Sequence, residues 1–243
     1  MLYKILYKLK RLIFLIYDYY KFWRISFLPK NKKFQYIYKS KYWQNIENGS
    51  LSGSGSNIIS TEKIRIELKD FISQYKISSI IDIPCGDWEW MSMFDLSNIE
   101  YVGYDVVQEL ITVNNKKYKS KNINFAVKNL IYDPLPKTDF IIIRDMLNHL
   151  DESDIHKCIK NLQNSEFQFI GITNFPDIND NITNILGDKF RLGDRWRPIN
   201  FSIKPFNLNH PLINLNDSCD LSEFARIKYL SIWKKDSFIF NNK

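Results

Sequence analysis

Three stretches of the 243-residue sequence hold side chains whose types and spacing suit the binding and chemistry of a small ligand. In the first, IIDIPCGDW, an apolar run meets Asp82 and then a turn that contains Gly86. In the second, another apolar run ends at Asp105. A glycine lets the backbone approach a ligand closely, and an acid roughly 20 residues further on commonly accepts the ribose hydroxyl protons of a nucleoside. These two stretches predict a nucleoside site, although each acid could equally be an ordinary strand-end carboxylate.

The turn after Asp82 has fewer glycines than a dinucleotide site needs. A dinucleotide-binding loop carries G-x-G-x-x-G to bring the backbone against a pyrophosphate, whereas residues 82–88 contain Gly86 alone. The missing glycines argue against NAD and FAD and favour a nucleoside cofactor without phosphates. S-adenosylmethionine is the obvious one.

The third stretch, RDMLNHL, follows the apolar run DFIII at residues 139–143. His149 has an ordinary pKa near ~6.5 and is suited to accept the proton of a hydroxyl nucleophile, with Asp145 orienting it or acting as the base itself. The alternative is that His149 caps the next helix or lines the nucleoside pocket. We therefore take His149 and Asp145 as the candidate catalytic residues.

Alternating strand and helix signals define the scaffold that must position these side chains. Apolar residues at helical spacing predict helices over 64–75 and 151–162. Strand-like runs occur at 79–83, 99–104, 123–127, 139–143, 167–173, 212–215 and 228–233. Short apolar strands separated by helices indicate an α/β fold with a Rossmann-like, doubly wound, mostly parallel sheet. Little helix separates the last two runs, so they predict an antiparallel edge in a seven-stranded sheet.

The N-terminal segment differs in charge from the rest of the chain. Residues 1–33 hold nine Lys and Arg against one Asp, so the remaining residues are close to neutral within a total charge of +7. We expect no nucleic-acid partner, because such surfaces concentrate positive charge. Residues 1–33 predict a basic amphipathic helix that contacts an anionic membrane surface through residues 1–30, or packs on the domain or on a second subunit. The oligomeric state is unknown from the sequence.

Domain boundaries follow from these patterns. We expect the helix over 1–33, a connecting segment with a Gly/Ser loop over 34–57, and one catalytic domain over 58–243. The Gly/Ser stretch, residues 49–57, either closes over the cofactor or is a plain flexible linker. Three scattered cysteines and three histidines without paired spacing fit a reducing compartment and point to no metal site.

Four motifs, taken together, resemble a known family. DIPCGDW resembles the first motif of class I S-adenosylmethionine-dependent methyltransferases, with Pro84 and Trp88 in place of the outer glycines. The likeness is closer to a subgroup found among bacterial capsule and lipopolysaccharide genes. In that subgroup an SGSGS element comes first, an RD-x-L-x-HL segment follows, and then G-D-x-WRP-x-N with PF shortly after. Residues 52–56, 82–91, 144–150 and 193–206 match in this order.

The resemblance implies roles for individual residues. It implies a cofactor site at Asp82, Pro84, Cys85, Gly86, Asp87, Asp105, Asn129, Leu130 and Arg144. Of these, Asn129 stands where the family commonly has Asp and would accept from the adenine amino group through its amide oxygen. Substrate contacts are implied at Asp194, Arg195, Trp196, Arg197 and Asn200, where arginines beside a tryptophan suit an acidic, sugar-bearing substrate.

The resemblance also implies an activity and a place in the cell. We expect a cytoplasmic enzyme, peripheral on the inner face of the cell membrane if residues 1–30 bind it. It would methylate a sugar hydroxyl of a surface polysaccharide or of its nucleotide- or lipid-linked precursor. The alternatives are methylation of a small metabolite or a nitrogen atom, and a cofactor-binding membrane-surface scaffold that has lost its chemistry.

Overall fold

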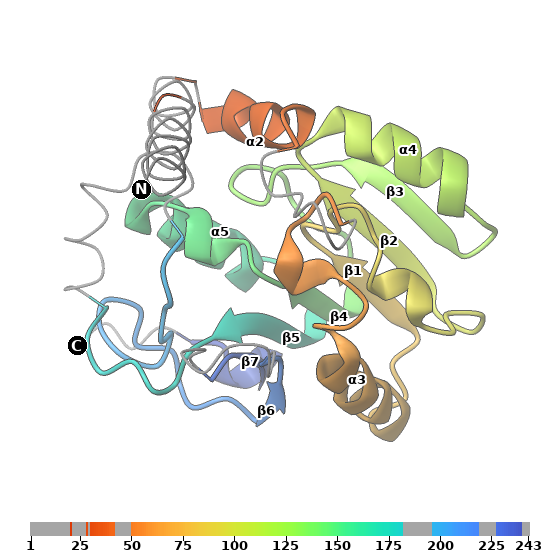
Figure 1. Cartoon of the computed structure of the whole chain (residues 1–243). Helices are drawn as coiled ribbons and strands as arrows, with labels where there is room; N and C mark the ends of the chain where they lie inside the picture. The colour runs from red at the N-terminus through yellow and green to blue at the C-terminus, as the bar shows by residue number, and fades with distance from the viewer. Residues whose placement is uncertain are drawn as a thin grey trace, which may run out of the picture.

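The computed structural model describes residues 20, 28, 30–41, 50–181, 196–218 and 227–239. A seven-stranded sheet forms its centre, in the order β3-β2-β1-β4-β5-β7-β6 (Figure 1). The strands are β1 (Ser79–Asp82), β2 (Glu100–Asp105), β3 (Ile123–Val127), β4 (Thr138–Ile143), β5 (Phe167–Asn174), β6 (Ile213–Asn216) and β7 (Tyr229–Lys234). Each lies within a few residues of a predicted strand, and the apolar runs of the central strands β1, β4 and β5 are almost fully buried.

The pairing of the strands confirms the predicted doubly wound sheet with an antiparallel end. Strands β1 to β5 pair in parallel, and Ile81 of β1 lies opposite both Val102 and Ile141. Strand β7 pairs antiparallel with β5 and with β6, so it lies one place in from the edge that β6 forms. The strand order reverses between β1 and β4, and ligands of open α/β sheets bind at such a point.

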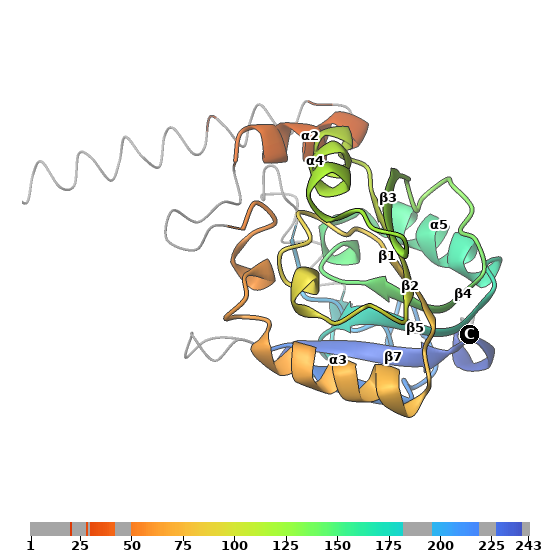
Figure 2. The same cartoon turned by 90° about the vertical axis from the view of Figure 1, so that its right-hand side faces the viewer.

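Helices cover both faces of the sheet (Figure 1, Figure 2). Helix α3 (Glu62–Gln74) and α4 (Gln108–Tyr118) share one apolar cluster, to which they contribute Phe71 and Ile111. Helix α5 (Glu152–Gln163) places Ile155, Cys158 and Ile159 in a second cluster with the other face. Its apolar stripe and acidic start match the helix predicted over 151–162.

Helix α2 (Lys30–Lys39) is the main departure from the predicted organisation. It begins directly after Pro29 and crosses the boundary expected at residue 33, so the predicted connecting segment contains most of a helix. Phe34, Ile37 and Tyr38 have helical spacing, and Ile37 is buried. Figures 1 and 2 both show α2 beside α4, above the carboxyl ends of the strands.

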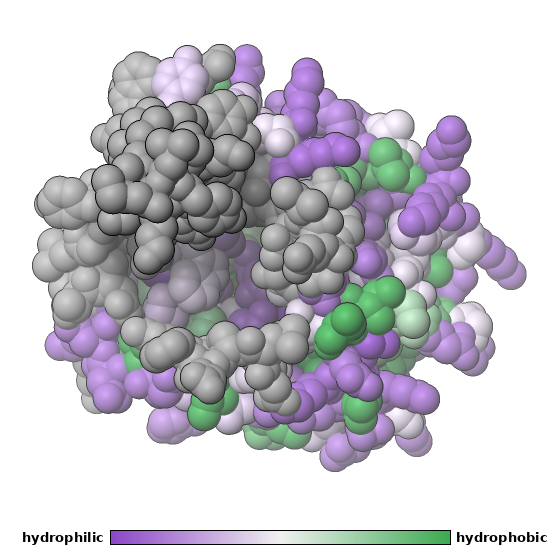
Figure 3. Space-filling view, viewed as in Figure 1, coloured by the Kyte–Doolittle hydropathy of each residue, from purple (hydrophilic) through white to green (hydrophobic). Residues whose placement is uncertain are grey.

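The outer surface of the domain is mixed in polarity. In the space-filling view, hydrophilic side chains cover much of the right-hand side, and apolar groups appear among them (Figure 3). The exposed apolar residues include Ile59 and Ile66. None of the helices in the described part of the chain has the length and apolarity needed to cross a bilayer. Most of the basic segment predicted over residues 1–33 lies outside the described residues.

Candidate functional site

A pocket of about 820 Å³ lies at the carboxyl ends of the central strands, where the strand order reverses. Eleven of the residues predicted to act in the site line it: Pro84, Cys85, Gly86, Asp87, Asp105, Asn129, Leu130, Arg144, Asp145, His149 and Trp196. Parallel strands bring these residues together because their carboxyl ends meet at one edge of the sheet. Residues more than 100 positions apart in the sequence therefore line the same pocket.

The turn after β1 and the acid after β2 meet at the floor of this pocket. The Gly86 N–H donates to Oδ2 of Asp105 at 3.2 Å, and the Val107 N–H donates to Oδ1 at 2.9 Å. Burial raises the pKa of Asp105 to about 6, although these backbone donors partly oppose the shift. Asn114 of α4 donates to the Gly86 carbonyl and fixes the turn from behind.

Gly86 occupies a position that no other residue type would fit without movement. Its φ of +55° lies in the left-handed region, and an added Cβ would lie 2.4 Å from Oγ of Ser52. Ser52 also contacts the Tyr38 hydroxyl at 3.0 Å and accepts the Asp87 N–H at 3.0 Å. Helix α2, the Gly/Ser loop and the turn after β1 therefore pack on one another.

The Gly/Ser loop forms part of the pocket wall. Ser52, Gly53, Gly55 and Ser56 line the pocket. Oδ2 of Asp87 accepts the Ser50 hydroxyl at 2.9 Å and the Leu51 N–H at 2.6 Å, so the Asp87 side chain holds the start of the loop. The Gly/Ser loop is therefore packed on the turn after β1, and its closure over a cofactor stays a prediction.

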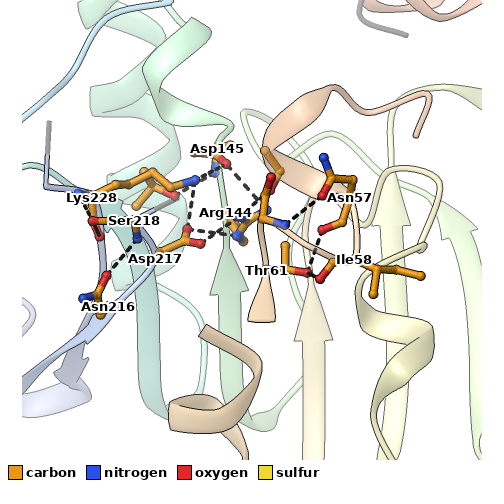
Figure 4. Close-up of polar contacts among 12 residues, drawn as sticks. Asn57, Ile58, Thr61, Arg144, Asp145, Asn216, Asp217, Ser218 and Lys228 are labelled. Atoms are coloured by element: carbon orange, nitrogen blue, oxygen red, sulfur yellow. Dashed lines mark hydrogen bonds and ion pairs between the residues drawn. The ribbon is translucent and has the colours of Figure 1, made fainter. Parts of the chain in front are cut away.

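Four charged side chains form a linked cluster at the end of β4 (Figure 4). Arg144 donates to Asp217 through two nitrogens at 2.9 and 2.7 Å, and it also donates to the Gly55 carbonyl at 2.7 Å. Nζ of Lys228 lies 2.8 Å from Oδ2 of Asp145 and 3.0 Å from Oδ2 of Asp217. The cluster joins the ends of β4 and β6, the start of β7 and the Gly/Ser loop.

This cluster counts against Asp145 as a general base. Burial acts to raise the pKa of Asp145, but Lys228 and Arg144 outweigh it and hold that pKa well below its ordinary value. A carboxylate stabilised in this way takes up a proton poorly at neutral pH. Both candidate catalytic residues line the pocket, and His149 remains as the candidate base because the charged neighbours of Asp145 disfavour its protonation.

Three predicted site residues lie outside the pocket lining, which corrects their predicted contacts. Asp82 is buried beneath the turn and accepts the Tyr101 hydroxyl at 2.7 Å, and burial raises its pKa to about 7. Asn200 is buried, and its amide donates to the Ile178 carbonyl.

Arg197 is the third of these residues. Its side chain is buried, and its backbone pairs with that of Asn148, because the Arg197 N–H donates to the Asn148 carbonyl at 3.0 Å. The Asn148 amide donates in turn to the Arg197 carbonyl at 2.8 Å. These two bonds link the residue after Trp196 to the residue before His149. Asp194 and Arg195 lie outside the described residues.

Asn129 makes a hydrogen bond within its own loop, and its contact with adenine stays a prediction. Its Oδ1 accepts the Ile131 N–H at 3.0 Å, so the amide oxygen expected to face adenine already closes a turn. Asn129 and Leu130 nevertheless line the pocket after β3, as the sequence predicts.

Several residues that line the pocket were not predicted from the sequence. Lys33, Phe34 and Tyr38 come from α2, and Lys228 comes from the start of β7. Asp217 directly follows β6 and could have been found as one more acid at a strand end. The pairing of Asp217 with Arg144, 73 residues away, has no sequence signal.

Comparisons with known proteins identify the fold. No protein family matches the sequence, and no curated protein matches it. The structure resembles magnesium protoporphyrin IX methyltransferase (ChlM) from Synechocystis PCC 6803 with bound SAH, at a TM-score of 0.56 and 12% identity over 82% of this chain and 92% of that chain.

Two further structures of similar size share the architecture. The methyltransferase domain of bacterial CtHen1-C matches at a TM-score of 0.54 and 14% identity, over 72% of this chain and 98% of that chain. The N-methyltransferase NodS from Bradyrhizobium japonicum WM9 matches at 0.51 and 14%, over 71% and 95%. The fold of this chain is therefore the methyltransferase type of Rossmann-like fold.

Proposed function

We propose that this protein transfers the methyl group of S-adenosylmethionine to a sugar hydroxyl of a surface polysaccharide, or of its nucleotide- or lipid-linked precursor. The observation that carries the proposal is the contact between Gly86 and Asp105 within one pocket at the strand ends. A close backbone turn beside a buried acid suits a nucleoside ligand without phosphates.

The chemistry and size of the pocket fit this cofactor. Its volume of about 820 Å³ lies in the usual range of small-molecule sites, roughly 300–1,000 Å³. The Asp105 carboxylate would accept the ribose hydroxyls, and Leu130 with Ile131 would pack on adenine. When bound, the cofactor supplies a methyl group on a positively charged sulfur.

The residues of this chain would prepare the acceptor hydroxyl. Transfer of a methyl group is an in-line displacement, so the protein aligns the acceptor and removes its proton. His149 is the residue that we assign to this proton transfer. Trp196 lines the same pocket and offers a flat apolar ring to a sugar face. NodS, one fold neighbour, is an N-methyltransferase, so a nitrogen or small-metabolite acceptor is the competing candidate.

The test combines binding and turnover. Wild-type protein should bind S-adenosylmethionine in a calorimetric titration and form S-adenosylhomocysteine with at least one member of a panel of sugar precursors. His149→Ala should lower kcat by roughly 10²- to 10⁴-fold, because a positioned base is lost, while cofactor affinity stays unchanged.

His156→Ala is the matched control, since His156 packs on Phe206 away from the pocket. If the protein turned over only amines or small metabolites, the proposed sugar hydroxyl would be wrong as the acceptor. Binding without turnover on any acceptor would support a non-catalytic scaffold instead.

A further inference from the structure

The charged cluster at the end of β4 presents a fixed pair of opposite charges to the pocket. Asp145 and Lys228 both line the pocket, whereas the side chain of Asp217 has an exposed fraction of 0% and lies behind them. Asp217 and Arg144 hold the pair in place through two short ion pairs (Figure 4). The Asp145 N–H donates to the Thr173 hydroxyl at 2.8 Å, which fixes a backbone with φ of +54°.

Each member of this pair keeps one hydrogen-bonding position available for a ligand. The contacts of the Asp145 carboxylate within the described part of the chain all go to Oδ2, which leaves Oδ1 as a free acceptor. Nζ of Lys228 has three protons, and its partners among the same residues are the carboxylates of Asp145 and Asp217. One anionic acceptor and one cationic donor therefore lie side by side.

The position of this pair along the sheet matches the far end of the proposed cofactor. The residues after β3 and β2, Leu130 and Asp105, would hold adenine and ribose. Neighbouring strands lie about 4.8 Å apart, so the next part of a linear ligand falls over the ends of β1 and β4. Asp145 is the second residue after β4. This end of the cofactor is an amino acid with an ammonium and a carboxylate.

We propose that Asp145 and Lys228 form a recognition site for the zwitterionic amino-acid end of the cofactor, with Oδ1 of Asp145 accepting from the ammonium and Nζ of Lys228 donating to the carboxylate. The assignment rests on the proposed function. It replaces the roles predicted for Asp145 as a base and for Asp82 as a direct contact of the cofactor. Arg144 and Asp217 are positioning residues in this site.

A series of ligands with an uncharged thioether sulfur tests the two contacts separately. Methylthioadenosine has adenine, ribose and sulfur only, decarboxylated S-adenosylhomocysteine adds the ammonium, and S-adenosylhomocysteine adds the carboxylate as well. Calorimetric titration of the wild-type protein should give affinities that rise in this order. Each charged contact should contribute at least about tenfold.

The variants should each remove one step of this series. Lys228→Met should bring the affinity for S-adenosylhomocysteine down to that for its decarboxylated form. Asp145→Asn should reduce the affinity for both amine-bearing ligands by at least about tenfold. Neither change should alter the affinity for methylthioadenosine, which also shows that the variants are folded.

Lys234→Met is the matched control, because Lys234 is an exposed lysine at the other end of β7 and should behave as wild type. If both variants kept the wild-type ratios between the three ligands, the amino-acid end would be held elsewhere and this inference would be overturned. If wild-type protein bound none of the three, the proposed function itself would fail.

Discussion

Asp82 and Asp105 carry a pH dependence of stability that follows from their burial. Burial raises the pKa of Asp82 to about 7 and that of Asp105 to about 6, from an ordinary value near 3.8. Between these values the native state binds more protons than the unfolded chain, so the free energy of unfolding falls as pH rises from about 4 to about 7. Above this window the cost of the two buried charges is present in full.

Replacing Asp82 should remove most of its share of this dependence. We expect the loss of unfolding free energy between pH 5 and pH 8 to shrink by a few kcal/mol in Asp82→Asn, since one pKa unit corresponds to about 1.4 kcal/mol. Denaturant unfolding at several pH values measures it. Tyr101→Phe removes the hydroxyl that lowers the pKa of Asp82. In this variant the free energy of unfolding should therefore continue to fall up to a higher pH than in the wild type. Equal slopes in all three proteins would contradict the assignment.

For single residues, the sequence predicts the place in the fold better than the partner that the side chain contacts. Gly86 and Asp105 meet as expected, because each follows a strand and neighbouring parallel strands end together. Asp82 also ends a strand, yet its side chain turns toward Tyr101 behind the pocket. The register pairs Asp82 with Gly103, so Asp82 and Asp105 point to the same face of the sheet, and Asp105 reaches the pocket because it lies two residues further toward the carboxyl ends of the strands.

At the scale of elements, the Gly/Ser loop and the turn after β1 depend on each other through one close approach. Gly86→Ala would place a Cβ 2.4 Å from Oγ of Ser52 at a positive φ, whereas an added Cβ at Gly55 would have no neighbour nearer than 3.6 Å. We expect Gly86→Ala to lower the free energy of unfolding by about 1–3 kcal/mol and Gly55→Ala to stay within about 0.5 kcal/mol of wild type. Urea unfolding of both variants tests the contrast.

The protein should also lose cofactor affinity when Gly86 changes, because Ser52 and Tyr38 are displaced with it. An unfolding curve for Gly86→Ala that matches wild type would show that the loop moves aside freely. The Gly/Ser loop would then be a flexible linker and not a fixed part of the pocket lining.

Element positions were predictable where burial alone determines them. The strands and α5 carry apolar patterns that are buried as expected. Helix α2 was not predicted, because its stripe of Phe34, Ile37 and Tyr38 is short and follows Pro29, a residue type that commonly ends a helix. The contact between Tyr38 and Ser52 is tertiary, so no local pattern shows it.

At the scale of the whole molecule, the sequence concentrates its positive charge in the first 33 residues. These residues have a net charge of +8, whereas the whole chain has a net charge of +7. The rest of the chain is therefore close to neutral. An anionic bilayer attracts clustered basic residues by about 1 kcal/mol each, provided that they lie near its surface. The predicted amphipathic helix would bring them there and insert its aromatic side chains at the interface.

Membrane attachment would place the pocket near lipid-linked sugars, which connects this segment to the proposed acceptor. Full-length protein should sediment with phosphatidylserine-containing liposomes. Replacing Lys4, Lys8, Lys10 and Arg11 by Gln should weaken that binding by at least about tenfold. Added salt should weaken the wild type in the same direction, because screening reduces the attraction of exposed charges.

Four lysines on the surface of the domain provide the matched control for this experiment. Lys69, Lys76, Lys119 and Lys121 are exposed in the structure. Replacing them by Gln changes the net charge of the protein by the same amount, so it separates total charge from charge at the N-terminal segment. Equal liposome binding by both variants and the wild type would favour the alternative in which residues 1–33 pack on protein. A shift in oligomeric state in the N-terminal variant would then identify a second copy of the chain as the partner.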